Sequence, residues 1–117
     1  SGGGFSVSYL KDIDWLKGKQ FYYWGDIDAQ GFQILNQFRI YFPNTIAVMM
    51  DEETLGSFKS GEGKPATNQN LAQLTESELK LYNHLRQNNI RLEQEKITQT
   101  FAEDKIKKLF QRQPSYA

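Results

Sequence analysis

The stretch Gln20-Phe21-Tyr22-Tyr23-Trp24-Gly25-Asp26-Ile27-Asp28 decides the fold class of this 117-residue chain. Residues 20–24 are a short apolar run with a preference for β-structure, and Gly25 ends it, so we expect a strand buried on both faces. After a polar turn, residues 32–41 place apolar side chains at helical spacing until Pro43 stops the pattern. A strand followed by a helix and a further strand implies a right-handed crossover and a parallel pair.

The alternation of strands and helices continues along the chain. Residues 45–50 indicate a second buried strand, and Asp51 is a suitable N-cap for a short helix over residues 52–58. Thr75-Glu76-Ser77-Glu78 is a capping box, which predicts a helix to about residue 87. We therefore expect an α/β fold with a small, mainly parallel sheet flanked by helices.

Three further segments complete the expected organisation. Residues 7–17 have helical spacing, residues 90–97 fit a strand or a helix, and Thr100-Phe101-Ala102-Glu103 matches a capping box that opens a last helix. Residues 5–113 are expected to form one partial domain, with residues 1–4 as a disordered leader or cloning remnant and residues 114–117 as a tail. Two or three strands are fewer than an ordinary doubly wound domain uses.

The composition excludes several kinds of chemistry. The chain has no cysteine and one histidine, His84. A disulfide framework, a thiolate zinc site, a cysteine nucleophile and a multi-histidine metal cage are therefore ruled out. No apolar run approaches the ~20 residues that span a bilayer, so we expect a soluble, cytoplasmic protein with no membrane contact. Any catalytic chemistry would therefore use carboxylates, hydroxyls, amides, lysine or arginine.

The zero net charge hides an asymmetry between the two halves. Residues 1–58 carry 4 basic and 7 acidic side chains, and residues 59–117 carry 10 and 7. The C-terminal helix holds a basic cluster: Lys105, Lys107, Lys108 and Arg112. This cluster fits a solvated helix face better than a strip that contacts the DNA backbone, and both interpretations stay open.

Asp26 and Asp28 place two carboxylates on one turn at the end of a strand. Like charges at that distance oppose joint ionisation unless a cation neutralises them. Mg²⁺ suits such a pair, because it needs one or two protein carboxylates and completes its shell with water and substrate phosphate. The alternative is that Asp28 caps a helix and Asp26 is a solvated turn residue.

Glu93 and Glu95 form a second acidic element. On a strand they would project from the same face and could share one metal ion. On a helix they would lie ~200° apart and could not. A charged surface segment, with Arg91 and Lys96 as partners, is the simpler interpretation.

Several ordered blocks of the chain resemble the C-terminal, Toprim-like domain of the JetD family in bacterial Wadjet anti-plasmid defence. The blocks are Tyr23-Trp24-Gly25-Asp26-Ile27-Asp28-Ala29-Gln30-Gly31-Phe32, Met50-Asp51 with Thr54-Leu55, Leu74-Thr75 with Glu78, and Arg91-Leu92-Glu93-Gln94-Glu95. Together they span roughly residues 4–109. The resemblance implies a Toprim-like fold and Mg²⁺-dependent cleavage of double-stranded plasmid DNA, with Mn²⁺ as a substitute metal, in concert with SMC-like subunits. A second copy of the chain is a further option as a partner.

The resemblance also assigns roles to individual residues. Asp26 and Asp28 match the catalytic D-x-D that holds the metal in Toprim domains, and Glu93, Glu95 and Asp51 match acidic positions with metal-ligating or supporting roles. Toprim domains use a further glutamate on an earlier strand, and this chain has no glutamate before Glu52. We therefore expect an N-terminally truncated domain that is inactive in isolation.

Two other function classes compete with a nuclease. One is a non-catalytic protein- or DNA-interaction domain in which the acids are helix caps. The other is a phosphatase of the haloacid dehalogenase type, which also has D-x-D after a buried strand. That family usually has Thr or Val two residues after the second aspartate, where this chain has Gln30.

Overall fold

The computed structural model describes residues 19–112, so the expected helix over residues 7–17 lies outside them. The described part is mixed α/β, as expected from the sequence. Its elements, in order, are β1 (Tyr22–Tyr23), α1 (Ala29–Tyr41), β2 (Ile46–Ala47), α2 (Glu52–Ser57), β3 (Gly61–Glu62), α3 (Glu76–Asn88), β4 (Ile90–Arg91), the 3₁₀ helix η3 (Gln94–Lys96) and α4 (Gln99–Arg112).

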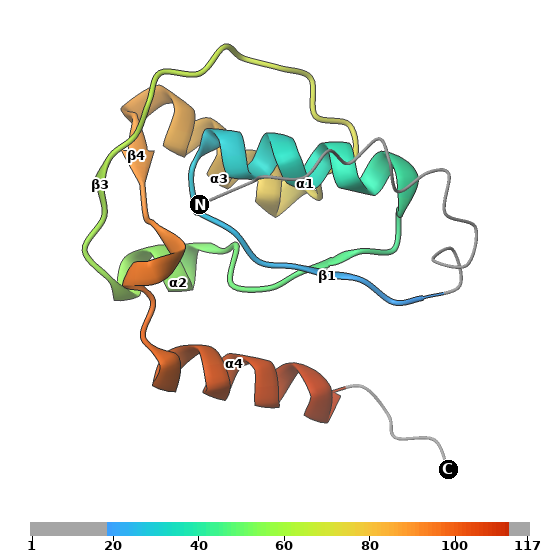
Figure 1. The fold of residues 1–117 in the computed structure, drawn as a ribbon. Helices are drawn as coiled ribbons and strands as arrows, with labels where there is room; N and C mark the ends of the chain where they lie inside the picture. Colours follow the sequence, from blue (N-terminus) through green and yellow to red (C-terminus); the bar gives the residue numbers. More distant parts are fainter. Residues whose placement is uncertain (1–18, 113–117) are drawn as a thin grey trace.

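The parallel pair β1–β2 lies between helices on both sides (Figure 1). Successive side chains of a strand point to opposite faces. Accordingly, the ring of Phe21 packs toward α1, with centroid distances of 5.5 Å to Phe38 and 4.6 Å to Phe42. The ring of Tyr22 faces the other way and lies 5.5 Å from the ring of Phe110 on α4. Tyr22 and Phe110 are nevertheless exposed, so the expected burial of this strand on both faces is wrong on the α4 side.

The strands are shorter than expected, and they form two sheets in the described region rather than one. β2 covers only Ile46–Ala47 of the predicted run over residues 45–50, and Met49 has a φ of 57° in the left-handed region. An extended strand does not continue through such a residue. The second pair, β3–β4, is antiparallel, and β3 lies in the Gly- and Pro-containing stretch between α2 and α3, whose composition is typical of a loop.

Helices α1 and α3 pack against each other around the core, which includes Phe32, Leu35, Leu81 and Leu85. A nearly buried ion pair joins the two helices. Arg39 donates from Nη1 to Glu78 Oε1 at 2.5 Å and from Nη2 to Oε2 at 3.1 Å. Burial raises the pKa of Glu78, but hydrogen bonds from Arg39 and Thr75 outweigh it and lower the pKa overall.

Helix starts follow the expected caps with one correction. The capping box at Thr75 is present, with both reciprocal hydrogen bonds. The second proposed box at Thr100 is wrong, because α4 already begins at Gln99 and the side chain of Thr98 accepts from the N–H of Phe101 at 3.2 Å. None of the helices within residues 19–112 has the length and apolar character to cross a bilayer.

Candidate metal-binding site

A single antiparallel bridge brings the two acidic elements together. Ile27 and Leu92 exchange backbone hydrogen bonds of 2.9 and 3.0 Å, and both side chains are fully buried. Because side chains alternate along extended backbone, the residues on either side of the bridge point away from the core. Asp26 and Asp28 therefore face the same side as the residues that flank Leu92, which are Arg91 and Glu93.

Each aspartate uses one oxygen for the fold and directs the other toward Arg91. Asp26 Oδ1 accepts from the N–H of Gln94 at 2.7 Å, and Oδ2 accepts from Arg91 Nη2 at 2.9 Å. Asp28 Oδ1 caps α1 by accepting from the N–H of Gly31 at 2.6 Å. Its Oδ2 lies 3.4 Å from Arg91 Nε, which is an ion pair without a well-formed hydrogen bond. Two carboxylate oxygens thus converge on one cation, the guanidinium of Arg91.

The environment of this pair opposes the charge on Asp28. Burial is the main cause that raises the pKa of Asp28, and the neighbouring Asp26 adds to it. The hydrogen bond from Gly31 and the charge of Arg91 act in the opposite direction without cancelling the shift. The hydrogen bond to Asp26 raises the pKa of Arg91 and keeps it a permanent cation. A second positive charge beside Asp28 would favour its ionised form and so lower its pKa.

Tyr23 and Gly31 hold the strand end against the first turn of α1. The hydroxyl of Tyr23 donates to the carbonyl of Gly31 at 3.0 Å. Burial, followed by the charges of Asp28 and Asp26, raises the pKa of Tyr23 far above its ordinary value, so this phenol stays neutral. A Cβ on Gly31 would lie 2.1 Å from the carbonyl oxygen of Asp26. The missing side chain of Gly31 therefore leaves room for the backbone of the aspartate turn.

The Oδ2 atoms of Asp26 and Asp28 are ligands of the type that a hard divalent cation prefers. Two carboxylate oxygens, turned to one point, suit Mg²⁺ when water and a substrate phosphate complete its six ligands. Within residues 19–112, however, no three acidic or histidine side chains converge as a metal cage would require. A metal at this place would therefore rest on Asp26 and Asp28, and it would take the position that Arg91 now holds.

The other predicted acids lie at the margin of this centre or away from it. Glu93 is exposed, and its Oε2 lies 4.0 Å from Arg91 Nη2. Glu95 is exposed within η3, so the strand alternation that would bring it beside Glu93 is lost. Asp51 caps α2, and its Oδ1 accepts from the N–H and hydroxyl of Thr54 at 2.9 and 2.7 Å.

The basic cluster of α4 is largely engaged in contacts of its own. Lys105 forms an ion pair with Glu53 and lies over the ring of Phe101, 5.4 Å from its centroid. Lys108 pairs with Asp104 one turn away at 3.2 Å. Lys107 is exposed and free of ion pairs in the described structure, and the position of the Arg112 side chain is not described.

Sequence reasoning missed the role of Arg91, which it treated as a partner in a surface segment. The available signal was the pattern of the two motifs. Both D-I-D and R-L-E place charged residues on either side of one apolar residue, as expected for two extended segments that bury their central side chains. Pairing of these segments across 65 residues brings Arg91 to the aspartates.

The family model described as "Wadjet protein JetD, C-terminal" matches residues 1–106. No curated protein matches the chain.

Proposed function

Because the chain belongs to the family of JetD C-terminal regions, we propose that it carries the metal-binding acids of a Toprim-like, Mg²⁺-dependent DNA nuclease. Membership of this family ties the chain to Wadjet defence and indicates a multi-subunit defence complex. The nuclease activity, the metal and the plasmid DNA substrate are our proposal. The observation that carries it is the convergence of Asp26 Oδ2 and Asp28 Oδ2 on a single cationic group.

The residues of the chain have separate tasks in this proposal. Asp26 and Asp28 would hold the metal through their Oδ2 atoms, while their Oδ1 atoms stay bound to the N–H groups of Gln94 and Gly31. These two N–H groups keep the carboxylates in place, so little reorganisation is needed when a cation binds. A bound Mg²⁺ would supply Lewis-acid polarisation of the scissile phosphate.

The proposed nuclease is tested by plasmid cleavage in the assembled Wadjet complex with Asp26→Asn. This change removes the charge and keeps an oxygen that can accept from Gln94. We expect cleavage to fall by about a hundredfold or more, on the scale of losing one stabilising group at a reaction centre. Asp104→Asn is the matched control, because Asp104 is an exposed aspartate on α4 whose one ion pair within residues 19–112 is with Lys108. Equal cleavage by the two variants would remove the aspartate pair from the mechanism.

A non-catalytic interaction domain is the second candidate. It is favoured by the ion pairs that both aspartates already form with Arg91, since a structural role needs no metal. In that case the Asp26→Asn complex would retain full defence against plasmids in cells and would cleave DNA like the unchanged complex.

A further inference from the structure

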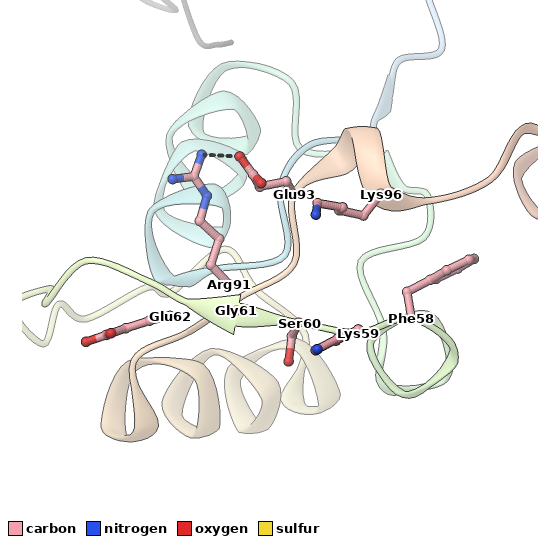
Figure 2. A pocket seen from close by; sticks show the side chains of 8 residues that line it. All are labelled: Phe58, Lys59, Ser60, Gly61, Glu62, Arg91, Glu93 and Lys96. Atoms are coloured by element: carbon pink, nitrogen blue, oxygen red, sulfur yellow. Dashed lines mark ion pairs between the residues drawn. The ribbon is translucent and has the colours of Figure 1, made fainter.

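A pocket opens directly beside the aspartate pair, and Arg91 is part of its wall (Figure 2). Its volume is about 630 Å³. The lining residues come from the segment after α2, from β3, and from the stretch that runs from β4 through η3: Phe58, Lys59, Ser60, Gly61, Glu62, Arg91, Glu93 and Lys96. The pocket and the proposed metal site therefore share one side chain, the guanidinium of Arg91.

The free polar groups of this pocket are mainly cationic. Lys59 and Lys96 make no ion pair within the described residues; in Figure 2 the ammonium group of Lys96 lies on the side of Glu93, and that of Lys59 lies beside the Ser60 hydroxyl. In the same view Glu62 extends away from the two lysines. The remaining acid, Glu93, lies 4.0 Å from Arg91. The net charge of the lining is positive, three basic against two acidic residues.

Arg91 itself is poorly satisfied by the aspartates. A guanidinium has five N–H donors in a planar fork. Within residues 19–112, Arg91 forms one hydrogen bond, from Nη2 to Asp26, and its buried Nε has no hydrogen-bond partner. A phosphate group matches this fork with two parallel hydrogen bonds and a full negative charge.

We propose that this pocket binds a backbone phosphate of DNA through Lys59, Lys96 and Arg91. The inference rests on the proposed nuclease function and adds the subsite that holds the strand. When a phosphate occupies the pocket, Arg91 turns from the aspartates to the phosphate. The two Oδ2 atoms are then more accessible to a divalent metal than in the DNA-free chain, where the metal has to displace Arg91. Phosphate binding moves the Arg91 guanidinium away from the aspartates and so favours metal binding. Metal binding in turn frees Arg91 for the phosphate.

The pocket predicts a specific loss of DNA binding when either lysine loses its charge. We would measure the affinity of the chain for a 12-base-pair duplex by fluorescence anisotropy, in EDTA, over a range of salt concentrations. Lys59→Gln and Lys96→Gln should each weaken binding several-fold and reduce the slope of log K against log salt by about 0.9, the value for one phosphate contact. Lys80→Gln, an exposed lysine on α3, is the control and should match the unchanged chain.

The exchange of Arg91 is tested separately with Mn²⁺ in the absence of DNA. Arg91→Gln removes the competing cation, so we expect it to bind Mn²⁺ more tightly than the unchanged chain by electron paramagnetic resonance, and to bind the duplex in EDTA more weakly. Arg91→Lys keeps the charge, and it should bind Mn²⁺ more weakly than Arg91→Gln. Thermal melts confirm that each variant is folded.

Two outcomes would overturn the inference. One is duplex binding by Lys59→Gln and Lys96→Gln that equals binding by Lys80→Gln. The other is weaker Mn²⁺ binding by Arg91→Gln than by the unchanged chain. Failure of the nuclease proposal would give a result different from both of these. The unchanged chain would then bind no Mn²⁺, while Lys59 and Lys96 would still contribute to duplex binding in EDTA.

Discussion

Asp28 has two tasks, and they use different oxygens of the same carboxylate. Oδ1 caps α1 through the N–H of Gly31, and Oδ2 faces Arg91. Capping alone would favour asparagine or serine as much as aspartate. Burial beside Asp26 makes the charge unfavourable, as the raised pKa of Asp28 records. A charge that is kept against such a cost is typical of functional sites.

Replacement of Asp28 separates the cap from the charge. The folded protein binds the Asp28 proton more tightly than the unfolded chain does, so the free energy of unfolding falls as the pH rises from 3.8 to the raised pKa. Without metal at pH 7, Asp28→Asn should therefore be at least as stable as the unchanged chain. Asp28→Ala should be less stable than Asp28→Asn by about 1 kcal/mol, because it also loses the cap.

Urea unfolding in EDTA between pH 4 and pH 8 measures this prediction. The stability advantage of Asp28→Asn should grow as the pH rises through the window above 3.8. Added Mn²⁺ should reverse the order, because it stabilises only the chain with both carboxylates. An Asp28→Asn variant that is clearly less stable than the unchanged chain in EDTA at pH 7 would show that the charge serves the fold.

The turn between β1 and α1 sets the positions of both aspartates at the scale of elements. The bridge of Ile27 with Leu92 fixes one side of the turn, and the capped first turn of α1 fixes the other. Gly31 allows the two to meet, because its missing side chain leaves room for the carbonyl of Asp26. The precision of the site therefore depends on a residue that contributes no chemistry.

Gly31→Ala should damage the site while leaving every carboxylate in place. A Cβ that would lie 2.1 Å from the Asp26 carbonyl forces the turn to move. We expect a loss of about 1–3 kcal/mol, as for other overpacked sites, and weaker Mn²⁺ binding. Gly56→Ala is the control, because a Cβ on this helical glycine meets nothing within 4 Å. That variant should be unchanged or more stable by up to ~1 kcal/mol. Equal Mn²⁺ affinity in the two variants would contradict the role of the turn.

At the scale of the whole molecule, the locally encoded parts were predicted well. The capping box at Thr75 and the cap at Asp51 act over three residues, and both are present. The α/β class followed from the short aromatic strand and the amphipathic α1. Asp26 and Asp28 lie on one turn at the strand end and both pair with Arg91; a metal ion shared between them stays a prediction.

Features that depend on distant pairing were not predictable from one sequence. The antiparallel pair β3–β4 draws on a segment that looks like a loop, and its partner strand lies about 28 residues further on. The bridge from Ile27 to Leu92 likewise decides that Arg91 is the counter-ion. Glu95 has strand spacing relative to Glu93, but η3 begins between them. Local patterns therefore located the acids and could not identify their partner.

The most direct test of the central claim is a crystal structure of the chain soaked in Mn²⁺, with anomalous data collected at the manganese edge. We predict one anomalous peak about 2.1 Å from both Asp26 Oδ2 and Asp28 Oδ2, with the guanidinium of Arg91 moved out toward the pocket. A map without a peak at this position, in which Arg91 still bridges the two aspartates, would contradict the account.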